Sequence, residues 1–100
     1  MKRRTVAFSP EAQGDLLRLY DWIAGAAGST VAIRYIDRLE AYCRRLDYAS
    51  ERGRQRNDIR AGIRVIGFEK RITIAFIVDE NEVTVLRLFH GGRDWESAMR

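Results

Sequence analysis

Residues 58–95, DIRAGIRVIGFEKRITIAFIVDENEVTVLRLFHGGRDW, decide the fold of this chain, because three short β-rich segments follow one another there. The segments are 58–68, 72–78 and 83–95, and charged turns separate them. Arginines alternate with apolar side chains in the first and the third segment. A period of two is typical of a strand that buries one of its faces. The stretch therefore predicts an antiparallel meander with one buried face and one basic face.

The composition predicts a single domain over residues 1–100 that is rich in arginine. The hydrophobic fraction is 46%, which suffices for one core at this length. Of the 18 basic residues only Lys2 and Lys70 are lysines, and the net charge is +4. Guanidinium groups favour planar, bidentate partners such as carboxylates and phosphates. The charge alone does not choose between nucleic acid and an acidic protein segment.

The residue inventory excludes several kinds of site. Cys43 is the only cysteine and His90 the only histidine, which leaves no intramolecular disulfide and too few ligands for zinc. No apolar signal core follows the basic N-terminus, and no run approaches the ~20 apolar residues of a membrane span. We expect a cytoplasmic protein without a metal, a cofactor or membrane contact.

The first half of the chain predicts a short strand followed by two helices. Residues 5–8 form the strand, and Ser9 and Pro10 are typical of a helix start. The glycines of residues 25–28 interrupt the helical pattern, and a second helix then runs from Ser29 or Thr30 to about Ala49. The order is β-α-α-β-β-β, an α+β fold in which an antiparallel sheet packs against an N-terminal helical hairpin.

The parity of side chains along the later strands predicts which residues face the helices. The larger set in the middle strand points inward, namely Ile72, Ile74, Phe76 and Val78. In the last strand we expect Leu86 and Leu88 to point inward, which leaves Arg87 on the outer face near Arg60 and Arg64. Cys43 falls on the apolar side of the second helix and is expected to be a buried small hydrophobe.

Four pieces of the sequence together resemble ParE toxins of the RelE/ParE superfamily, the toxin half of type II toxin–antitoxin pairs. They are residues 8–16 (FSPEAQGDL), 34–39 (RYIDRL), 58–64 (DIRAGIR) and 88–95 (LFHGGRDW). Their order and spacing span nearly the whole chain. The resemblance implies the RelE/ParE-like fold, a ParD-like antitoxin whose extended C-terminal segment wraps the toxin, and DNA gyrase as the target that the free toxin inhibits by binding. It implies no catalytic residue.

The alternative is a ribosome-dependent mRNA interferase, because RelE-like endoribonucleases share the fold. The resemblance implies that these nucleases use lysines or arginines on the meander and a tyrosine near the C-terminus. All four tyrosines of this chain precede the meander, and Met99 lies about where the terminal tyrosine is expected. His90 and Arg93 are the residues that would carry catalysis in this alternative, as acid or base and as a cation. The hypothesis that His90 only hydrogen-bonds the backbone at a strand end stands beside it.

Our candidates for contact with the antitoxin or the target are six residues of the second half of the chain. They are Arg60, Arg64, Arg87, His90, Arg93 and Trp95. The arginines can instead pair with Asp58, Glu69 or Glu82 in water, and Trp95 can instead cover an open end of the core. Direct DNA binding through Arg52, Arg54, Arg56 and Arg60 is not expected, because neither interleaved aromatic residues nor a recognition helix accompanies them.

Overall fold

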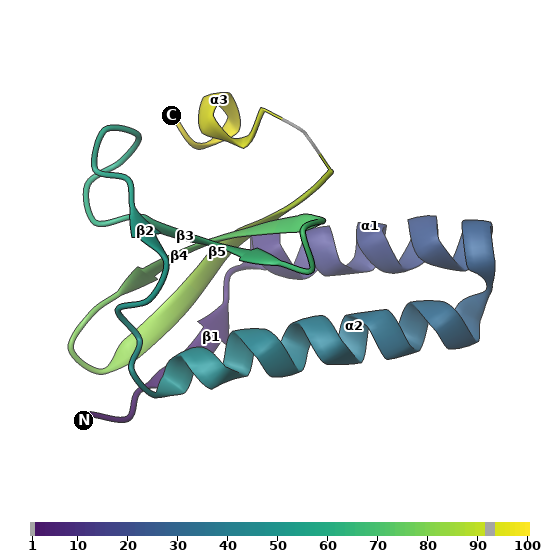
Figure 1. Cartoon of the computed structure of the whole chain (residues 1–100), viewed down its shortest axis with the longest axis horizontal. Coiled ribbons are helices and arrows are strands. Elements are labelled where there is room, and N and C mark those ends of the chain that lie inside the picture. Colours follow the sequence, from purple (N-terminus) through teal and green to yellow (C-terminus); the bar gives the residue numbers. More distant parts are fainter. Residues whose placement is uncertain (1, 92–93) are drawn as a thin grey trace.

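The computed structural model describes residues 2–91 and 94–100, which form a helical hairpin, a five-stranded sheet and a short C-terminal helix (Figure 1). The strand order in the sheet is β1-β5-β4-β3-β2. In chain order the elements are β1 (Thr5–Phe8), α1 (Pro10–Ala27), α2 (Ser29–Arg44), the 3₁₀ turn η1 (Arg45–Asp47), β2 (Arg54–Gln55), β3 (Arg64–Phe68), β4 (Ile72–Val78), β5 (Glu82–His90) and α3 (Trp95–Met99).

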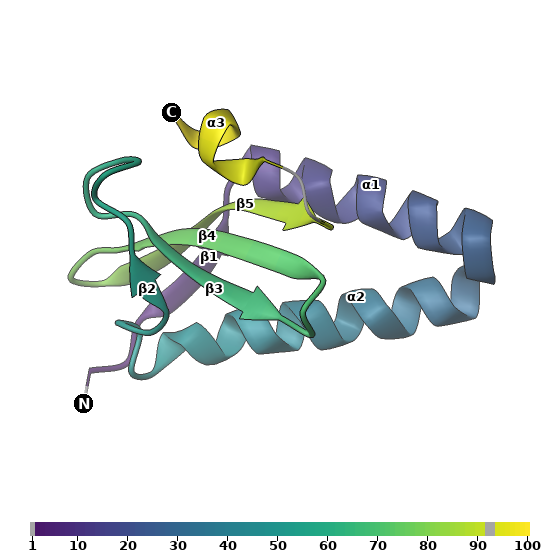
Figure 2. The ribbon, with the colours of Figure 1, turned by 45° about the horizontal axis from the view of Figure 1, so that its top comes forward.

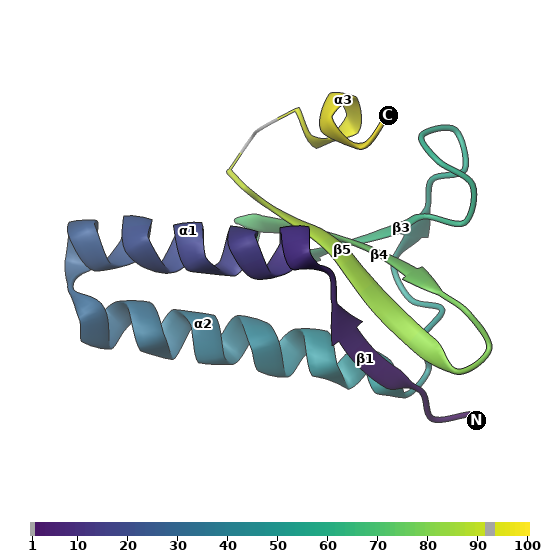
Figure 3. The ribbon, with the colours of Figure 1, turned by 180° about the vertical axis from the view of Figure 1, so that it is seen from behind.

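The helical hairpin begins as the sequence predicts. The Ser9 hydroxyl accepts a hydrogen bond from the Ala12 N–H at 3.0 Å and caps α1. Gly28, with a φ of +95°, separates α1 from α2, and the two helices run antiparallel (Figures 1 and 3). The prediction that the second helix reaches about Ala49 is wrong, because α2 ends at Arg44 and tightens into η1.

The sheet contains the predicted antiparallel meander of β3, β4 and β5, and β1 pairs in parallel with β5. The first meander strand is shorter than predicted. Residues 56–63 fold back on themselves, with the Arg56 N–H donating to the Ile63 carbonyl at 2.9 Å, so Arg60 lies in a loop. The third segment likewise divides into β5 and α3. Sequence analysis missed the two-residue strand β2, because Arg54 and Gln55 carry no apolar alternation.

The hairpin covers one face of the sheet, and β4 lies at the centre of that core. Ile72, Ile74 and Phe76 are buried there and Val78 packs against them, which confirms the parity predicted for β4. Cys43 of α2 is fully buried in the same core. Burial raises the pKa of its thiol to about 12, which confirms the prediction of a small hydrophobe.

A β-bulge in β5 resolves a conflict of parity in the last strand. Ala75 of β4 pairs with Arg87, but the next residue, Phe76, pairs with Val85, so Leu86 is the extra residue. Leu86 and Arg87 consequently share the face opposite the hairpin, while Val85 and Leu88 both face it. The prediction that Leu88 points inward is confirmed, and the same prediction for Leu86 is wrong.

The face of the sheet turned away from the hairpin holds a second apolar cluster, so the predicted basic face is wrong. Figure 2 shows α3 above the sheet and α2 below it. Met99 of α3 is buried there, with Trp95 and Leu86 packed against the cluster. Its buried members are Ile59, Ile63, Val65, Ala75, Phe89 and Met99. Within the described ranges, no helix is both long and apolar enough to cross a membrane.

Candidate functional site

Arginine side chains from three parts of the chain meet at a cavity of about 600 Å³ beside β5. Arg60 comes from the folded-back loop, Arg87 follows the bulge, and Arg100 follows α3. Glu11, from the first turn of α1, also lines this cavity, and Leu86 and Met99 form part of the apolar lining. We call this the arginine cavity. Such an arrangement suits a bound anion or a partner's carboxylate, since guanidinium groups bind both in a bidentate manner.

Asp15 of α1 holds Arg87 in place. Its carboxylate accepts two hydrogen bonds from the Arg87 guanidinium, at 2.8 and 3.1 Å, and one from Arg18 at 2.8 Å. It also accepts the backbone N–H of Leu88 at 2.9 Å. Asp15 is only 8% exposed, so these donors replace the water that a buried carboxylate loses.

The electrostatics of Asp15 show which of two opposing effects is larger. Burial raises the pKa of this carboxyl group, whereas the hydrogen bonds from Arg87, Leu88 and Arg18 lower it. The hydrogen bonds outweigh burial, so the pKa of Asp15 lies below its ordinary value. The same pairing raises the pKa of Arg87. Asp15 is therefore a charged structural partner, and its lone pairs are occupied.

The first residues of the hairpin also close the edge of the sheet beyond β1. The Ser9 N–H donates to the Val85 carbonyl at 2.9 Å, and the Ser9 hydroxyl donates to the Leu86 carbonyl at 2.8 Å. With the Leu88 N–H bound to Asp15, backbone groups along this part of β5 are satisfied by α1 and its cap. At the opposite edge, β2 pairs only with Arg64 and Val65, so residues 66–68 of β3 extend beyond it in the described structure.

His90 lies apart from the arginine cavity. Its ring packs against Trp22 of α1 with centroids 4.4 Å apart and planes tilted by 52°. The two rings line a smaller cavity of about 190 Å³ that also contains Asp15 and Arg18. His90, at the end of β5, therefore has the Trp22 ring of the hairpin as a neighbour, whereas the sequence suggested a hydrogen bond to the backbone.

Two other predicted contact residues, Arg64 and Trp95, do not line the arginine cavity. Arg64 shares the strand parity of Ile66 and Phe68 and so lies on the hairpin face, where its guanidinium donates to the Arg52 carbonyl at 3.4 Å. The expectation that Arg64 shares one outer face with Arg60 and Arg87 is wrong. Trp95 packs on the second apolar cluster beneath the Arg56 guanidinium, 5.2 Å from its ring centroid. Arg93 lies outside the described residues.

The carboxylates proposed as structural partners for the arginines bind other residues instead. Asp58 pairs with Arg56 at 2.8 Å and Glu69 with Arg38 at 3.1 Å. Arg56 also bonds Glu96, which ties α3 to the loop. Across the described ranges, no three histidine, cysteine or carboxylate side chains come together as a metal ion would require.

Asp15 is the residue that sequence reasoning missed. The sequence did contain a signal, because residue 15 falls between Ala12 and Leu19 on the apolar stripe of the first helix. An acid at such a position requires a buried donor. The pattern does not identify Arg87 and Leu88 as those donors, since they lie more than seventy residues further along the chain.

The chain is a small α+β protein with a helical hairpin on a mostly antiparallel sheet and arginines beside its last long strand. The family model described as "ParE toxin of type II toxin-antitoxin system, parDE" matches residues 6–95. The chain belongs to this ParE toxin family, which confirms the resemblance found in the sequence.

Solved structures of toxin–antitoxin complexes share the fold, including the following two. The chromosomal ParDE toxin–antitoxin system from P. aeruginosa has 20% sequence identity and a TM-score of 0.78, and the match covers 89% of this chain and 97% of that one. The RelBE2 toxin–antitoxin complex from Mycobacterium tuberculosis has 19% identity and a TM-score of 0.67, with 93% and 97% covered. A search of curated proteins finds no match.

Proposed function

We propose that this chain inhibits DNA gyrase by binding it, and that a ParD-like antitoxin neutralises it in the cytoplasm. The observation that carries the proposal is the separation of the only imidazole from the arginine cavity. Arg60, Arg87 and Arg100 line one cavity, whereas His90 packs on Trp22 in another. The ionisable lining of the arginine cavity is Glu11 and these arginines. Such a cavity suits an acidic group, and among the described residues its lining contains no histidine that could serve as acid or base.

The antitoxin proposal is supported by the open edge of β3. An extended segment can add a strand beside residues 66–68, where β2 no longer covers the sheet. Arg54 and Trp95 border a cavity of about 280 Å³ at this edge, which also contains Gly67 and Thr73. Acidic side chains on the added strand would pair with Arg54, and an apolar one would pack against Trp95.

A supercoiling assay tests the gyrase proposal. Purified protein is added to gyrase and relaxed plasmid, and we expect loss of supercoiling or trapping of cleaved DNA. Arg60→Ala should weaken the inhibition about tenfold or more, because it removes one cation from the arginine cavity. Arg34→Ala, an exposed arginine on α2 outside that cavity, is the matched control. Supercoiling that continues unchanged at excess toxin would contradict the proposal.

The observation that favours RNA cleavage is the proximity of His90 to Arg18. Both line the 190 Å³ cavity, where an acid or base and a cation would lie beside each other. A translating extract distinguishes this alternative, because gyrase inhibition leaves messages intact. Codon-phased mRNA cuts that disappear in His90→Ala would replace the gyrase proposal with this one.

A further inference from the structure

The positive charge of the chain is concentrated in one stretch. Residues 44–64 contain seven arginines and three acids, Asp47, Glu51 and Asp58, which gives a net charge of +4. That equals the net charge of the whole chain, so the other 79 residues are neutral in sum. The excess charge therefore belongs to the end of α2, the connection after it and the β2–β3 edge.

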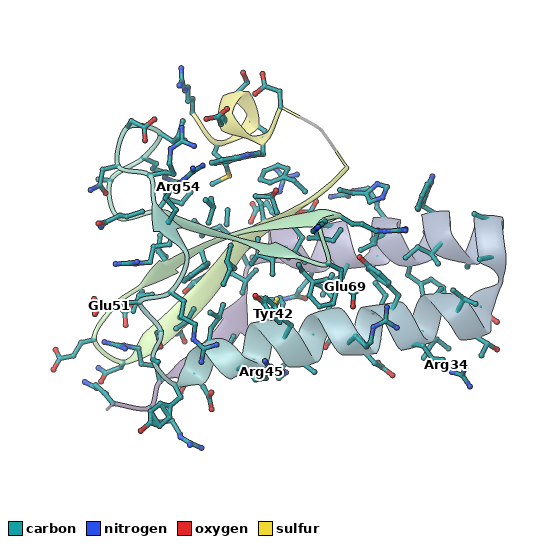
Figure 4. The ribbon with its side chains drawn as sticks, viewed as in Figure 1. Arg34, Tyr42, Arg45, Glu51, Arg54 and Glu69 are labelled. Carbon is teal, nitrogen blue, oxygen red and sulfur yellow. The ribbon has the colours of Figure 1, made fainter. Side chains whose placement is uncertain are left out.

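The fold brings this charge together at one end of the molecule, which we call the basic end. Figure 4 shows Arg45 just past the end of α2 and Arg54 in β2, both to the left of Arg34, which lies in the first half of α2. The Arg64 guanidinium donates to the Arg52 carbonyl, and the Arg52 guanidinium donates to the carbonyls of Tyr48 and Ala49. The arginines of the basic end are Arg44, Arg45, Arg52, Arg54 and Arg64.

The charges of the basic end are not neutralised within the described part of the chain. None of its five arginines has a carboxylate oxygen within 4.0 Å there, in contrast to Arg38, Arg56 and Arg87. Two of the three acids in residues 44–64 lie near arginines that do not belong to the basic end. Asp47 lies 3.9 Å from Arg3, and Asp58 pairs with Arg56. The positive charge of the basic end is thus not balanced by a carboxylate of the described residues, and Arg44, Arg45 and Arg54 are the most exposed of its arginines.

The positions of the exposed apolar side chains indicate whether the basic end suits an acidic protein or a nucleic acid as its partner. The most exposed large hydrophobic side chains are Leu17, Trp22, Val31 and Ile33, and all four lie on the hairpin. At the basic end the exposed aromatic is Tyr48, with the Arg3 guanidinium 5.5 Å from its ring centroid. Stable protein interfaces need a buried apolar centre, whereas contact with a phosphate backbone needs cations and hydrogen-bond donors.

We propose that the basic end binds the phosphate backbone of nucleic acid without reading its sequence. This goes beyond the proposed function and does not depend on gyrase being the target. The sequence-based expectation of no DNA binding rested on the absence of interleaved aromatic residues and of a recognition helix beside Arg52, Arg54, Arg56 and Arg60. The structure divides that cluster, because Arg56 is paired with Asp58 and Arg60 lines the arginine cavity. Sequence-independent binding needs no recognition helix, since the affinity comes from release of counterions.

Fluorescence anisotropy with a labelled duplex DNA of arbitrary sequence tests the proposal. Five phosphate contacts predict a slope of about −4.5 for log affinity against log salt, or about 500-fold weaker binding at 200 mM than at 50 mM NaCl. The double variant Arg45→Ala, Arg54→Ala should flatten the slope by about 1.8, because two contacts are lost. Both residues are exposed, so circular dichroism should show an unchanged fold.

The control variant Arg34→Ala, Arg71→Ala removes the same charge from exposed positions outside the basic end. It should keep the slope of the unmodified chain and bind within about twofold of it. Absence of salt-dependent binding at 50 mM NaCl, or an equal loss in the control, would overturn the proposal. So would displacement by poly-L-glutamate as effective as displacement by unlabelled duplex, since that result would indicate an acidic protein segment as the partner.

Discussion

The carboxylate of Asp15 joins α1 to β5 through Arg87 and the Leu88 N–H, and it does so at the point where β1 no longer covers the strand. A buried acid with three donors is expensive to disturb, because removing it leaves those donors without an acceptor. The orientation of Arg87 in the arginine cavity depends on this one side chain.

Replacing Asp15 with asparagine should lower the free energy of unfolding by about 2 to 4 kcal/mol. The amide cannot accept from all three donors and carries no charge to balance Arg87 and Arg18. Urea denaturation followed by circular dichroism measures the change. Asp21→Asn, at an exposed position of the same helix, should change stability by less than about 0.5 kcal/mol. Equal effects of the two substitutions would argue against the Asp15 network.

The difference between the unmodified chain and Asp15→Asn should depend on pH in a defined direction. The pKa of Asp15 is lowered in the folded state, so its contribution is fully present above the unfolded pKa of about 3.9. It is lost as the pH falls through the folded pKa. Denaturation curves between pH 2 and 7 should therefore show the two stabilities converging only in acid. A constant difference down to pH 2 would contradict this assignment.

The helices of the hairpin and the strands of the meander could be predicted from the spacing of apolar residues. The bulge in β5 and the short elements α3 and β2 could not. The bulge at Leu86 depends on how β5 pairs with β4, and nothing in the residues 83–90 alone chooses between the two parities. Similarly, α3 and β2 are too short for a periodic pattern. At the site, charge identified Arg60 and Arg87. Arg64 was misplaced because the second apolar cluster, which the sequence did not reveal, takes Ile63 and Val65 and leaves the alternate positions on the hairpin face.

Alanine substitutions at the two leucines of β5 test the bulge. Leu88 lies in the hairpin-facing core and should cost about 2 to 4 kcal/mol when truncated. Leu86 is only partly buried on the other face and should cost about half as much. Thermal or urea denaturation gives both values. A regular strand would place both leucines in one core, so equal costs would contradict the bulge.

Alanine substitutions at the two glycines near the tip of the hairpin should have opposite effects on stability. Gly25 lies within α1 with open space around an added Cβ, so Gly25→Ala should stabilise the chain by about 0.5 to 1 kcal/mol. Gly28 has a φ of +95°, and Gly28→Ala should destabilise it by about 1 kcal/mol or more. The two melting temperatures should therefore shift in opposite directions. A shift in the same direction would mean that the helix boundary lies elsewhere.

At the scale of the whole molecule, the sheet is buried between two apolar clusters while the hairpin extends past it (Figure 1). Residues 25–31 at the tip are exposed, whereas most of β4 is buried. Hydrogen exchange should follow this difference, with amides near the tip opening at low cost and those of β4 only on global unfolding. Mass spectrometry of peptides 20–33 and 72–78 provides the comparison. Similar protection in both would indicate that the hairpin tip is covered in solution.

The parallel pairing of β1 with β5 has a consequence for biosynthesis. The first strand and Asp15 find their partners more than seventy residues later, so neither can be satisfied until nearly the entire polypeptide has left the ribosome. The nascent chain therefore cannot complete its sheet until synthesis is almost finished, and a premature stop codon before position 82 would remove β5, the strand that joins β1 to β4.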